Sequence, residues 1–286
     1  MVRAALSPRV PIVTEVRSTE NLTPHMIRIV LGADELRGFP VGEFTDHYVK
    51  LQLPPPGASY RLPFDPAEVR QDLPKDQWHR QRTYTVRDAD PEAGTITIDF
   101  ITHGSGLAGP WAEAARPGDR VQLVGPGGAY APDPKADWHL LAGDEAVIPA
   151  IAVALPRIPA GVPAFVVLEI EDEIEQRGLE TRAGLSTKAD LRLTWIHRDG
   201  AGHTDEPRIL NLIESLDLPE GHGQAFVHGE AGMVREVRRH LANERAMDLD
   251  QLSATGYWKY RRTEEGWRED KPEWKRLAEQ DLDRTL

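Results

Sequence analysis

Short runs in which β-branched and aromatic residues alternate with polar ones dominate the first half of the chain. Such runs are typical of strands that bury one face, and Gly, Pro and Asp separate them. They predict six strands, which are Pro11–Val16, Met26–Leu31, His47–Leu53, Arg82–Arg87, Thr95–Phe100 and Arg120–Val124. One helix is predicted among them, at Pro110–Ala115. This pattern indicates an antiparallel barrel or sandwich.

The pattern changes after the Pro-rich stretch Gly125–Pro134. Strand-like apolar runs now alternate with segments whose apolar residues recur at helical spacing. The predicted order is strand Trp138–Gly143, helix Ile148–Leu155, strand Ala164–Ile170, strand Leu191–His197, helix Pro207–Leu216, strand Gln224–His228 and helix Ala231–Asn243. Alternating strands and helices predict an α/β domain with a parallel sheet. A last helix is expected to begin at Pro272, because Pro is favourable in a first helical turn.

The length of 286 residues suffices for two domains with their own cores. We expect an antiparallel β-barrel over residues 1–130, an α/β parallel-sheet domain over 131–250 and a C-terminal helical extension over 251–286. The chain contains no Cys, which excludes disulfides, thiolate metal sites and a cysteine nucleophile. Redox chemistry would therefore need a bound cofactor.

Charge and hydropathy narrow the class of partners. The chain has 34 Lys plus Arg against 46 Asp plus Glu, a net charge of −12, which opposes binding to nucleic acid. We find no apolar run of about 18 residues and therefore expect no membrane span. The segment Met1–Val16 lacks the apolar run of a secretory signal, so we expect a cytoplasmic protein. We also expect no protein-bound metal site.

Two motifs in the first half suit a phosphate-containing cofactor. In Arg82-Thr-Tyr-Thr85, strand alternation places Arg82 and Tyr84 on one face and Thr83 and Thr85 on the other. The alternative is an amphipathic strand with an exposed Arg. In Asp99–Trp111 a strand leads through a Gly-bearing loop to a helix start, where free N–H groups favour a phosphate. The alternative is a Gly-rich hairpin loop before a helix.

Acidic residues follow two strands of the second half. Asp144 and Glu145 lie in the first turn after a strand, where they would either meet the ribose or nicotinamide of a nucleotide or stabilise a helix start. Glu169, Glu171, Asp172 and Glu173 come after the apolar run Ala164–Leu168 of the next strand. In nucleotide-binding sheets an acidic residue at this position bonds the ribose 2′-OH, whereas a 2′-phosphate needs Arg or Lys; for a nicotinamide nucleotide the cluster therefore favours NADH over NADPH. The alternative is a solvated surface helix.

Taken together, several blocks resemble the siderophore-interacting protein family in their order and spacing. The blocks are Asp46–Leu51, Arg82–Thr85, Asp99–Trp111, Pro117–Asp119, Leu141–Glu145, Pro149–Ile151, His228–Ala231 and Gly256–Trp258. The resemblance extends from about residue 10 to the C-terminus. The family comprises FAD-dependent ferric-siderophore reductases of the ferredoxin-reductase-like superfamily. It implies an FAD-binding barrel, an NAD(P)H-binding α/β domain and a C-terminal extension that returns toward the flavin.

The resemblance also implies roles for individual residues. Carried over by position, the expected FAD-binding residues are Arg82, Tyr84, Thr85, Asp99, His103, Gly104, Ala108 and Trp111. For His103, a purely structural hydrogen-bonding role is the alternative. Asp144, Glu145, Glu169 and Glu230 are expected on the nucleotide side. Trp258 would cover the isoalloxazine or pack in the core. The ending Gly256–Trp267 with its added helix is similar to the NADH-using subgroup.

The reaction that the resemblance implies is hydride transfer from NADH to FAD, followed by electron transfer to chelated Fe(III) and release of Fe(II), with no catalytic side chain. Many ferric chelates are anionic, so an acidic protein needs a local basic patch. Lys259, Arg261 and Arg262 are the candidates, with Lys50 and Arg82 as lesser ones. The alternatives are a general NAD(P)H:flavin or protein-partner oxidoreductase, a non-catalytic siderophore-binding module, and a protein electron donor in place of the nucleotide.

Overall fold

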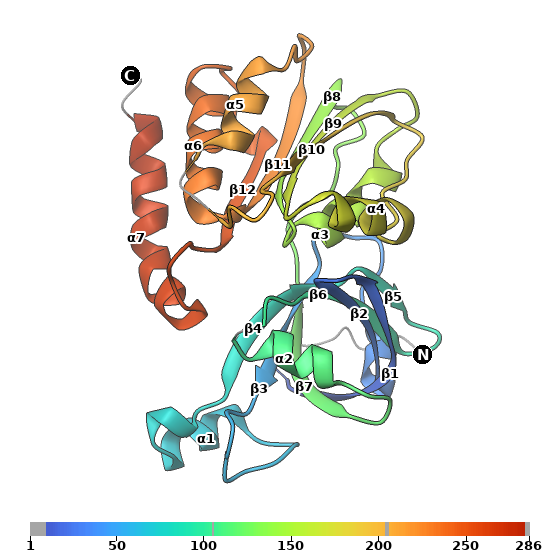
Figure 1. Cartoon of the computed structure of the whole chain (residues 1–286), viewed down its shortest axis with the longest axis vertical. Helices are drawn as coiled ribbons and strands as arrows, with labels where there is room; N and C mark the ends of the chain where they lie inside the picture. Colours follow the sequence, from blue (N-terminus) through green and yellow to red (C-terminus); the bar gives the residue numbers. More distant parts are fainter. Residues whose placement is uncertain (1–9, 105, 204–205, 284–286) are drawn as a thin grey trace. The chain divides into compact units, whose positions relative to one another are not determined.

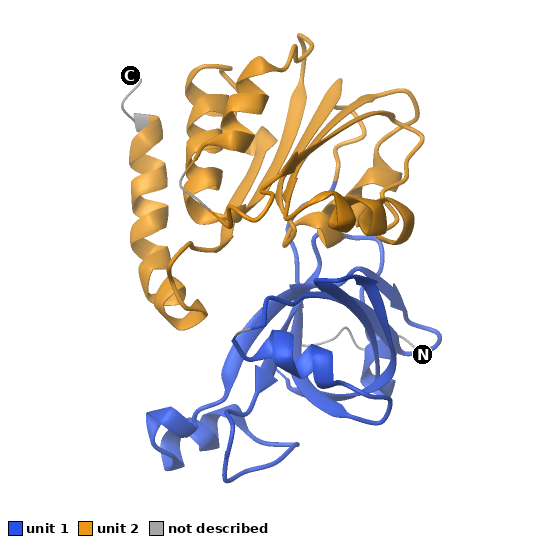
Figure 2. Cartoon of the chain, in the orientation of Figure 1, with its two compact units in different colours: residues 1–131 blue, residues 132–286 orange. Residues whose placement is uncertain are grey.

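The computed structural model describes residues 10–104, 106–203 and 206–283. The chain forms two compact units, residues 1–131 and residues 132–286 (Figure 2). The segment 251–286, expected as a separate extension, belongs to the second unit. In the part of the chain that is described, no helix has the length and apolarity needed to cross a membrane.

The first unit is an antiparallel sheet of seven strands in the order β4-β3-β7-β1-β2-β6-β5 (Figure 1). Its strands are β1 (Ile12–Thr23), β2 (Met26–Gly32), β3 (Tyr48–Leu53), β4 (Arg80–Thr85), β5 (Asp88–Asp90), β6 (Thr95–Ile101) and β7 (Arg120–Gly127). The helices are α1 (Pro66–Asp72) and α2 (Ala108–Ala114), with 3-10 turns at Asp34–Gly38 and Lys75–Gln77. All six predicted strands are present; β5 and α1 were not predicted.

The sheet closes into a barrel because its two edge strands follow each other in the chain. Only Val86 and Arg87 separate β4 from β5. The backbone N–H of Val86 donates to His47 O beside β3, and that of Arg87 donates to Thr97 O on β6. The continuous segment from β4 to β5 thus connects the two edges of the sheet, which removes most of the exposed edge. Alternate residues such as Leu51, Ile98 and Phe100 fill the interior.

The second unit is a parallel sheet of five strands in the order β10-β9-β8-β11-β12. The strands are β8 (Trp138–Asp144), β9 (Pro163–Ile170), β10 (Asp190–His197), β11 (Gly223–Glu230) and β12 (Leu252–Trp258). The helices are α3 (Ile148–Ala154), α4 (Glu173–Arg182), α5 (Arg208–Ser215), α6 (Ala231–Asn243) and α7 (Glu264–Asp283), with 3-10 turns at Leu155–Arg157 and Leu249–Gln251. Figure 1 shows α5 and α6 on one face of this sheet and α3 and α4 on the other. The predicted parallel α/β fold is confirmed.

The last helix begins earlier than predicted. It starts at Glu264 and contains Pro272 in its interior. Thr263 provides the start signal, because its Oγ1 accepts the Gly266 N–H at 3.1 Å and its carbonyl accepts the Trp267 N–H at 2.8 Å. The helix packs on α6 through Trp274, whose indole Nε1 donates to Ala231 O at 2.8 Å. Packing of this apolar face compensates for the hydrogen bond that an interior Pro removes.

Candidate functional site

The predicted cofactor strand β4 pairs with β3 at the edge of the first unit's sheet. Arg82 lies opposite Leu51 and Tyr84 opposite Val49, two fully buried residues. Arg82 and Tyr84 therefore share the inward face and are half-buried, whereas Thr83 is exposed on the other face. Thr85 is half-buried beside Tyr48. The alternation expected from the sequence is present, with a guanidinium and an aromatic ring side by side on one strand.

Three aromatic rings from separate elements meet beside this strand. The Tyr84 ring lies 4.4 Å from the Phe100 ring, and the Phe100 ring lies 5.6 Å from that of Trp111 on α2. Phe100 is completely buried, whereas Tyr84 and Trp111 are half-buried and rest on the core. Partly accessible rings held in place from behind suit the packing of a planar flavin. The structure thus brings Tyr84 and Trp111, two of the expected FAD residues, into one cluster.

Asp99 is engaged by a residue that the sequence analysis did not single out. Its two carboxylate oxygens accept from Arg28, with Nε–Oδ1 at 2.7 Å and the second guanidinium nitrogen at 2.8 Å from Oδ2. The Asp99 side chain is only 1% exposed, and the hydrogen bond from Arg28 raises the pKa of that arginine. Arg28 and Asp99 are direct cross-strand partners on β2 and β6. This geometry makes Asp99 part of the barrel wall, and its contact with FAD stays a prediction.

The loop before α2 has the features needed to receive a phosphate. His103 and Gly104 are exposed, and Gly104 and Gly106 have φ values of +67° and +80°. Ser105 lies outside the described residues. Ala108, the first residue of α2, is buried, and in the described chain no side-chain hydrogen bond caps the helix at Leu107. Backbone N–H groups at an uncapped helix start fit an anionic phosphate, so the residues of this unit fit FAD.

In the second unit the predicted nucleotide residues lie at the carboxyl edge of the sheet. From β8 the chain proceeds to β9 on one side, whereas β11 pairs with β8 on the other. This reversal is a topological switch point, and nucleotides bind in the crevice outside such a point. Asp144 ends β8 and Glu230 ends β11, so both lie at this position. The helix α3 starts directly after the turn that follows Asp144.

Asp144 is buried, and its hydrogen bonds connect the carboxyl ends of β8, β11 and β12. Its carboxylate accepts the Ala146 N–H at 2.8 Å, the Glu230 N–H at 2.8 Å and the Trp258 indole N–H at 2.9 Å. Burial, with a further contribution from the Glu145 carboxylate, raises the pKa of Asp144 to about 7. Because its oxygens serve three protein donors, Asp144 is best placed to position the edge of the site. The expected direct contact with the nucleotide stays a prediction.

Two glycines make this arrangement possible. Gly229 has φ +120°, and a Cβ there would lie 2.5 Å from Asp144 Oδ2. Gly143 has φ +159°, and a Cβ there would lie 2.1 Å from the backbone oxygen of His228. Only Gly permits strands β8 and β11 to approach each other and Asp144 this closely. The sequence shows that both glycines lie at the ends of predicted strands, but it does not show that β8 and β11 approach each other this closely.

Glu230 has a structural task as well. Its side chain accepts the Met233 N–H at 2.9 Å and so caps α6. The same carboxylate accepts the Tyr260 N–H at 3.2 Å, which fixes the chain just beyond β12. Asp144 and Glu230 together thus hold the segment around Trp258 against the end of β11.

The acidic cluster surrounds a buried arginine that sequence reasoning missed. The Arg198 side chain, 4% exposed, contacts the carboxylates of Glu145 and Glu171, the latter at 3.2 Å. Burial raises the pKa of the neighbouring Glu169, while the charge of Arg198 opposes that increase. Arg198 directly follows β10, so the ends of β8, β9 and β10 meet in one ion-pair network. Arg208, which pairs with Glu206, also acts on Glu169, so two guanidinium groups face four carboxylates and the network is net negative.

The remaining acidic residues of the cluster belong to α4. Asp172 accepts the N–H groups of Ile174 and Glu175 at 2.8 and 2.9 Å and caps the helix. Glu173 pairs with Arg177 at 2.7 Å on the exposed face. Asp172 and Glu173 therefore fit the alternative interpretation, in which they belong to a solvated helix start. The charge argument for NADH over NADPH rests on Glu145, Glu169 and Glu171.

Trp258 is the last residue of β12, and the expected substrate-binding cations other than Lys50 and Arg82 follow it within four residues. The Trp258 ring lies 4.5 Å from the His203 ring and is half-buried. Lys259 is half-buried, and Arg261 is exposed with its guanidinium 5.0 Å from the centre of the Tyr260 ring.

Two other expected cations have different surroundings. Arg262 forms an ion pair with Asp270 at 2.7 Å, which commits part of its charge to α7. Lys50 lies in the first unit on β3, with its Nζ 5.9 Å from the centre of the Tyr48 ring. Lys259 and Arg261 are thus the candidates best placed to offer positive charge next to Trp258.

Comparisons with known proteins agree with this architecture. Residues 15–130 match the model of the siderophore-interacting FAD-binding domain, and residues 136–261 match that of the siderophore-interacting protein. An uncharacterized protein of Mycobacterium tuberculosis is 38% identical over 91% of this chain and 94% of its own length. The ferric vibriobactin reductase ViuB of Vibrio cholerae is 32% identical over 87% of this chain and 90% of its own.

Solved structures show the same fold. The siderophore-interacting protein SipS from Aeromonas hydrophila has a TM-score of 0.76 at 27% identity, covering 93% of this chain and 98% of that one. A siderophore utilization protein from T. fusca has a TM-score of 0.77 at 29% identity, with coverages of 90% and 96%. The ferredoxin-NADP⁺ reductase of Plasmodium falciparum, at 10% identity and a TM-score of 0.59 over 88% of this chain and 98% of that one, shows the fold alone. By these matches, the chain belongs to the siderophore-interacting protein family and has an FAD-binding domain within a ferredoxin-reductase-like two-domain fold.

Proposed function

We propose that the protein is an NADH-dependent ferric-siderophore reductase that acts in the cytoplasm. The name of its relative ViuB, a ferric vibriobactin reductase that aligns along most of both chains, supports the reaction class. The observation that carries the proposal is the nucleotide-type edge of the second unit, where Asp144 and Glu230 fix the ends of β8, β11 and β12 at a topological switch point.

The first unit would hold the flavin by three kinds of contact. Arg82 would pair with the pyrophosphate, Tyr84 and Trp111 would pack against its rings, and the start of α2 would donate backbone N–H groups to phosphate. We propose His103, Gly104 and Thr85 as further contacts because they are accessible or half-buried near these elements. When bound, FAD supplies the ability to accept a hydride from NADH and to pass the two electrons singly to two chelated Fe(III) ions.

The chain's own residues then orient the reactants. Hydrogen bonds from Trp258 and from the Glu230 backbone to Asp144 fix the aromatic side chain at the nucleotide edge. Lys259 and Arg261, next in sequence, would attract the anionic chelate, and Arg262, which also pairs with Asp270, would contribute less; Lys50 stays a separate prediction on the first unit. Fe(II) is released because anionic oxygen donors hold a divalent ion less tightly than a trivalent one.

The preference for NADH follows from the charge around Arg198. Arg198 is engaged by Glu145 and Glu171, and the nearby Arg208 is engaged by Glu206, so the remaining negative charge of the cluster would repel a 2′-phosphate. Steady-state reduction of a ferric siderophore should therefore give a higher kcat/KM with NADH than with NADPH. The variant Glu171→Gln should narrow that difference, whereas Glu173→Gln, on the exposed face of α4, should not.

Three outcomes separate the rival functions. Turnover with free flavin or generic acceptors but no advantage for ferric chelates would identify a general flavin or protein-partner oxidoreductase. Chelate binding without NADH oxidation would leave two possibilities: a non-catalytic siderophore-binding module, or a reductase that receives its electrons from a protein. Reduction of the chelate after addition of reduced ferredoxin would identify the second. A preference for NADPH would contradict the proposed specificity for NADH, but it would leave the proposed ferric-siderophore reductase activity unchanged.

A further inference from the structure

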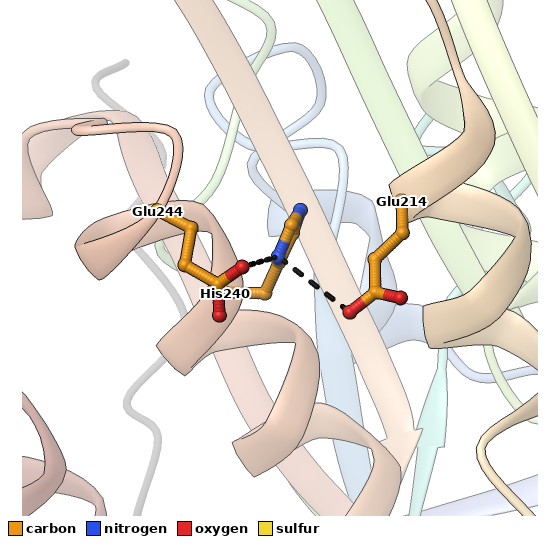
Figure 3. Close-up of side chains that lie close together, drawn as sticks. All are labelled: Glu214, His240 and Glu244. Carbon is orange, nitrogen blue, oxygen red and sulfur yellow. Dashed lines mark hydrogen bonds and ion pairs between the residues drawn. The ribbon is translucent and has the colours of Figure 1, made fainter.

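A buried histidine lies between two carboxylates near the C-terminal end of α6, in the second unit. His240 lies on α6, Glu244 is the residue that follows this helix, and Glu214 comes from α5 (Figure 3). His240 Nδ1 is 3.2 Å from a Glu244 oxygen and 3.8 Å from a Glu214 oxygen. Figure 3 shows both carboxylates turned toward the same nitrogen of the ring. None of these residues has a part in the proposed reductase site.

The separations match those within a metal coordination sphere. Zinc–nitrogen and zinc–oxygen bonds of roughly 2.1 Å in a tetrahedron place neighbouring ligand atoms about 3.4 Å apart. The two histidine–carboxylate separations, 3.2 and 3.8 Å, lie on either side of that value, and all three ligand atoms lie within 4.8 Å of one another. To bind a common ion, the two exposed carboxylates would turn inward around the imidazole nitrogen.

Burial fixes the imidazole, while the carboxylates leave a way in for an ion. The His240 side chain is 7% exposed, whereas Glu214 and Glu244 are 47% and 63% exposed. The exposed carboxylates can change their side-chain conformation more easily than the buried imidazole. An imidazole with two carboxylates is a donor set of nitrogen and oxygen that suits Zn²⁺, Fe²⁺, Co²⁺ or Mn²⁺.

One neighbour limits the affinity of this cluster. The Arg245 Nε lies 3.4 Å from His240 Nε2, and its side chain also donates to Glu214 O and Leu216 O at 3.2 Å. A metal on Nδ1 requires the proton to sit on Nε2, where it would face the Arg245 donor rather than an acceptor. Exchange of Arg245 for Gln would offer an amide oxygen to that proton.

We propose that Glu214, His240 and Glu244 bind a divalent transition-metal ion of borderline softness. The site lies at the end of α6 away from the nucleotide edge, about 14 Å along the helix from Ala231 at the helical rise of 1.5 Å per residue. This proposal is independent of the reductase proposal, because metal binding and ferric-chelate reduction are measured separately.

The test is titration of the full-length chain with ZnCl₂ in a calorimeter, repeated with CoCl₂. We expect a saturable site that the double variant Glu214→Gln/Glu244→Gln weakens at least tenfold, while Glu269→Gln, an exposed position on α7, leaves it unchanged. Arg245→Gln should tighten binding by about tenfold, the size of known effects of groups that contact a ligating histidine. The double variant should keep its ferric-chelate reductase activity.

Equal zinc affinity in the wild type and the double variant would overturn the proposal, as would a wild type that binds no zinc in the calorimeter. Because Glu214 and Glu244 are exposed, their exchange for Gln should leave the fold intact, and a thermal unfolding curve checks this directly. Added ZnCl₂ should raise the unfolding temperature of the wild type more than that of the double variant. An equal increase in both would also count against the site.

Discussion

Exchange of Asp144 for Asn should change how the stability of the protein depends on pH. The folded-state pKa of Asp144 is about 7, because burial penalises its charged form, whereas an unfolded chain has a value near the ordinary 3.8. Between these two values the folded state holds a proton that the unfolded state has lost. Stability contributed by this group is therefore present at low pH and is lost as the pH rises toward 7.

The size of the effect follows from the pKa difference. Each pH unit within the window is worth about 1.4 kcal/mol. From about pH 5 to about pH 8 the wild type should lose roughly 3 kcal/mol of unfolding free energy relative to Asp144→Asn, whose side chain does not titrate. The amide also removes one acceptor from the three N–H donors, which adds a destabilisation of about 1–3 kcal/mol that does not vary with pH.

Urea unfolding of both chains across this pH range, followed by tryptophan fluorescence, measures the difference directly. The control Asp217→Asn removes an exposed carboxylate from the same unit and should follow the wild type. A difference between wild type and Asp144→Asn that stays constant from about pH 5 to about pH 8 would refute the assignment of a proton to this carboxylate.

Further predictions concern the strand tips, the last helix and the basic patch. Gly229→Ala should destabilise the chain by about 3 kcal/mol in urea unfolding, because its φ of +120° is strained for Ala and the Cβ would meet Asp144. Trp274→Ala should cost about 3–5 kcal/mol, since it empties the contact of α7 with α6, and Trp274→Phe should recover part of it. Lys259→Ala/Arg261→Ala should raise KM for an anionic ferric siderophore about fivefold, for about 1 kcal/mol of lost attraction, and weaken its salt dependence. The exposed Lys275→Ala should leave KM unchanged, and an equal shift in both variants would contradict the patch.

The elements that the sequence predicted well are those with a strong local pattern. The alternation of apolar and polar residues predicted the six main strands of the barrel. Continuous apolar runs predicted the strands β8 to β11, and apolar residues at helical spacing predicted the helix α6. The sequence does not reveal the start of α7, because the local pattern around Pro272 favours a first helical turn there. In the structure, Thr263 caps the helix several residues earlier and packing tolerates the proline.

The candidate site was predicted in its positions but not in its contacts. Asp144 and Glu230 were identified, yet nothing local to either residue indicates that strands β8, β11 and β12 meet around one carboxylate. Arg28 and Arg198 were missed for the same reason, because their partners Asp99, Glu145 and Glu171 come from other strands. Such pairs are created by sheet order and register, which one sequence does not specify.

In the proposed reaction, a flavin in this protein passes electrons from NADH to chelated iron. The most direct measurement follows the flavin absorbance of the FAD-loaded full-length protein without oxygen. NADH should bleach the flavin, and a ferric siderophore added next should restore its absorbance while a ferrous-specific chelator reports two Fe(II) per flavin. A chain that binds no FAD, or a flavin that NADH leaves oxidised or that the ferric chelate fails to reoxidise, would contradict the account.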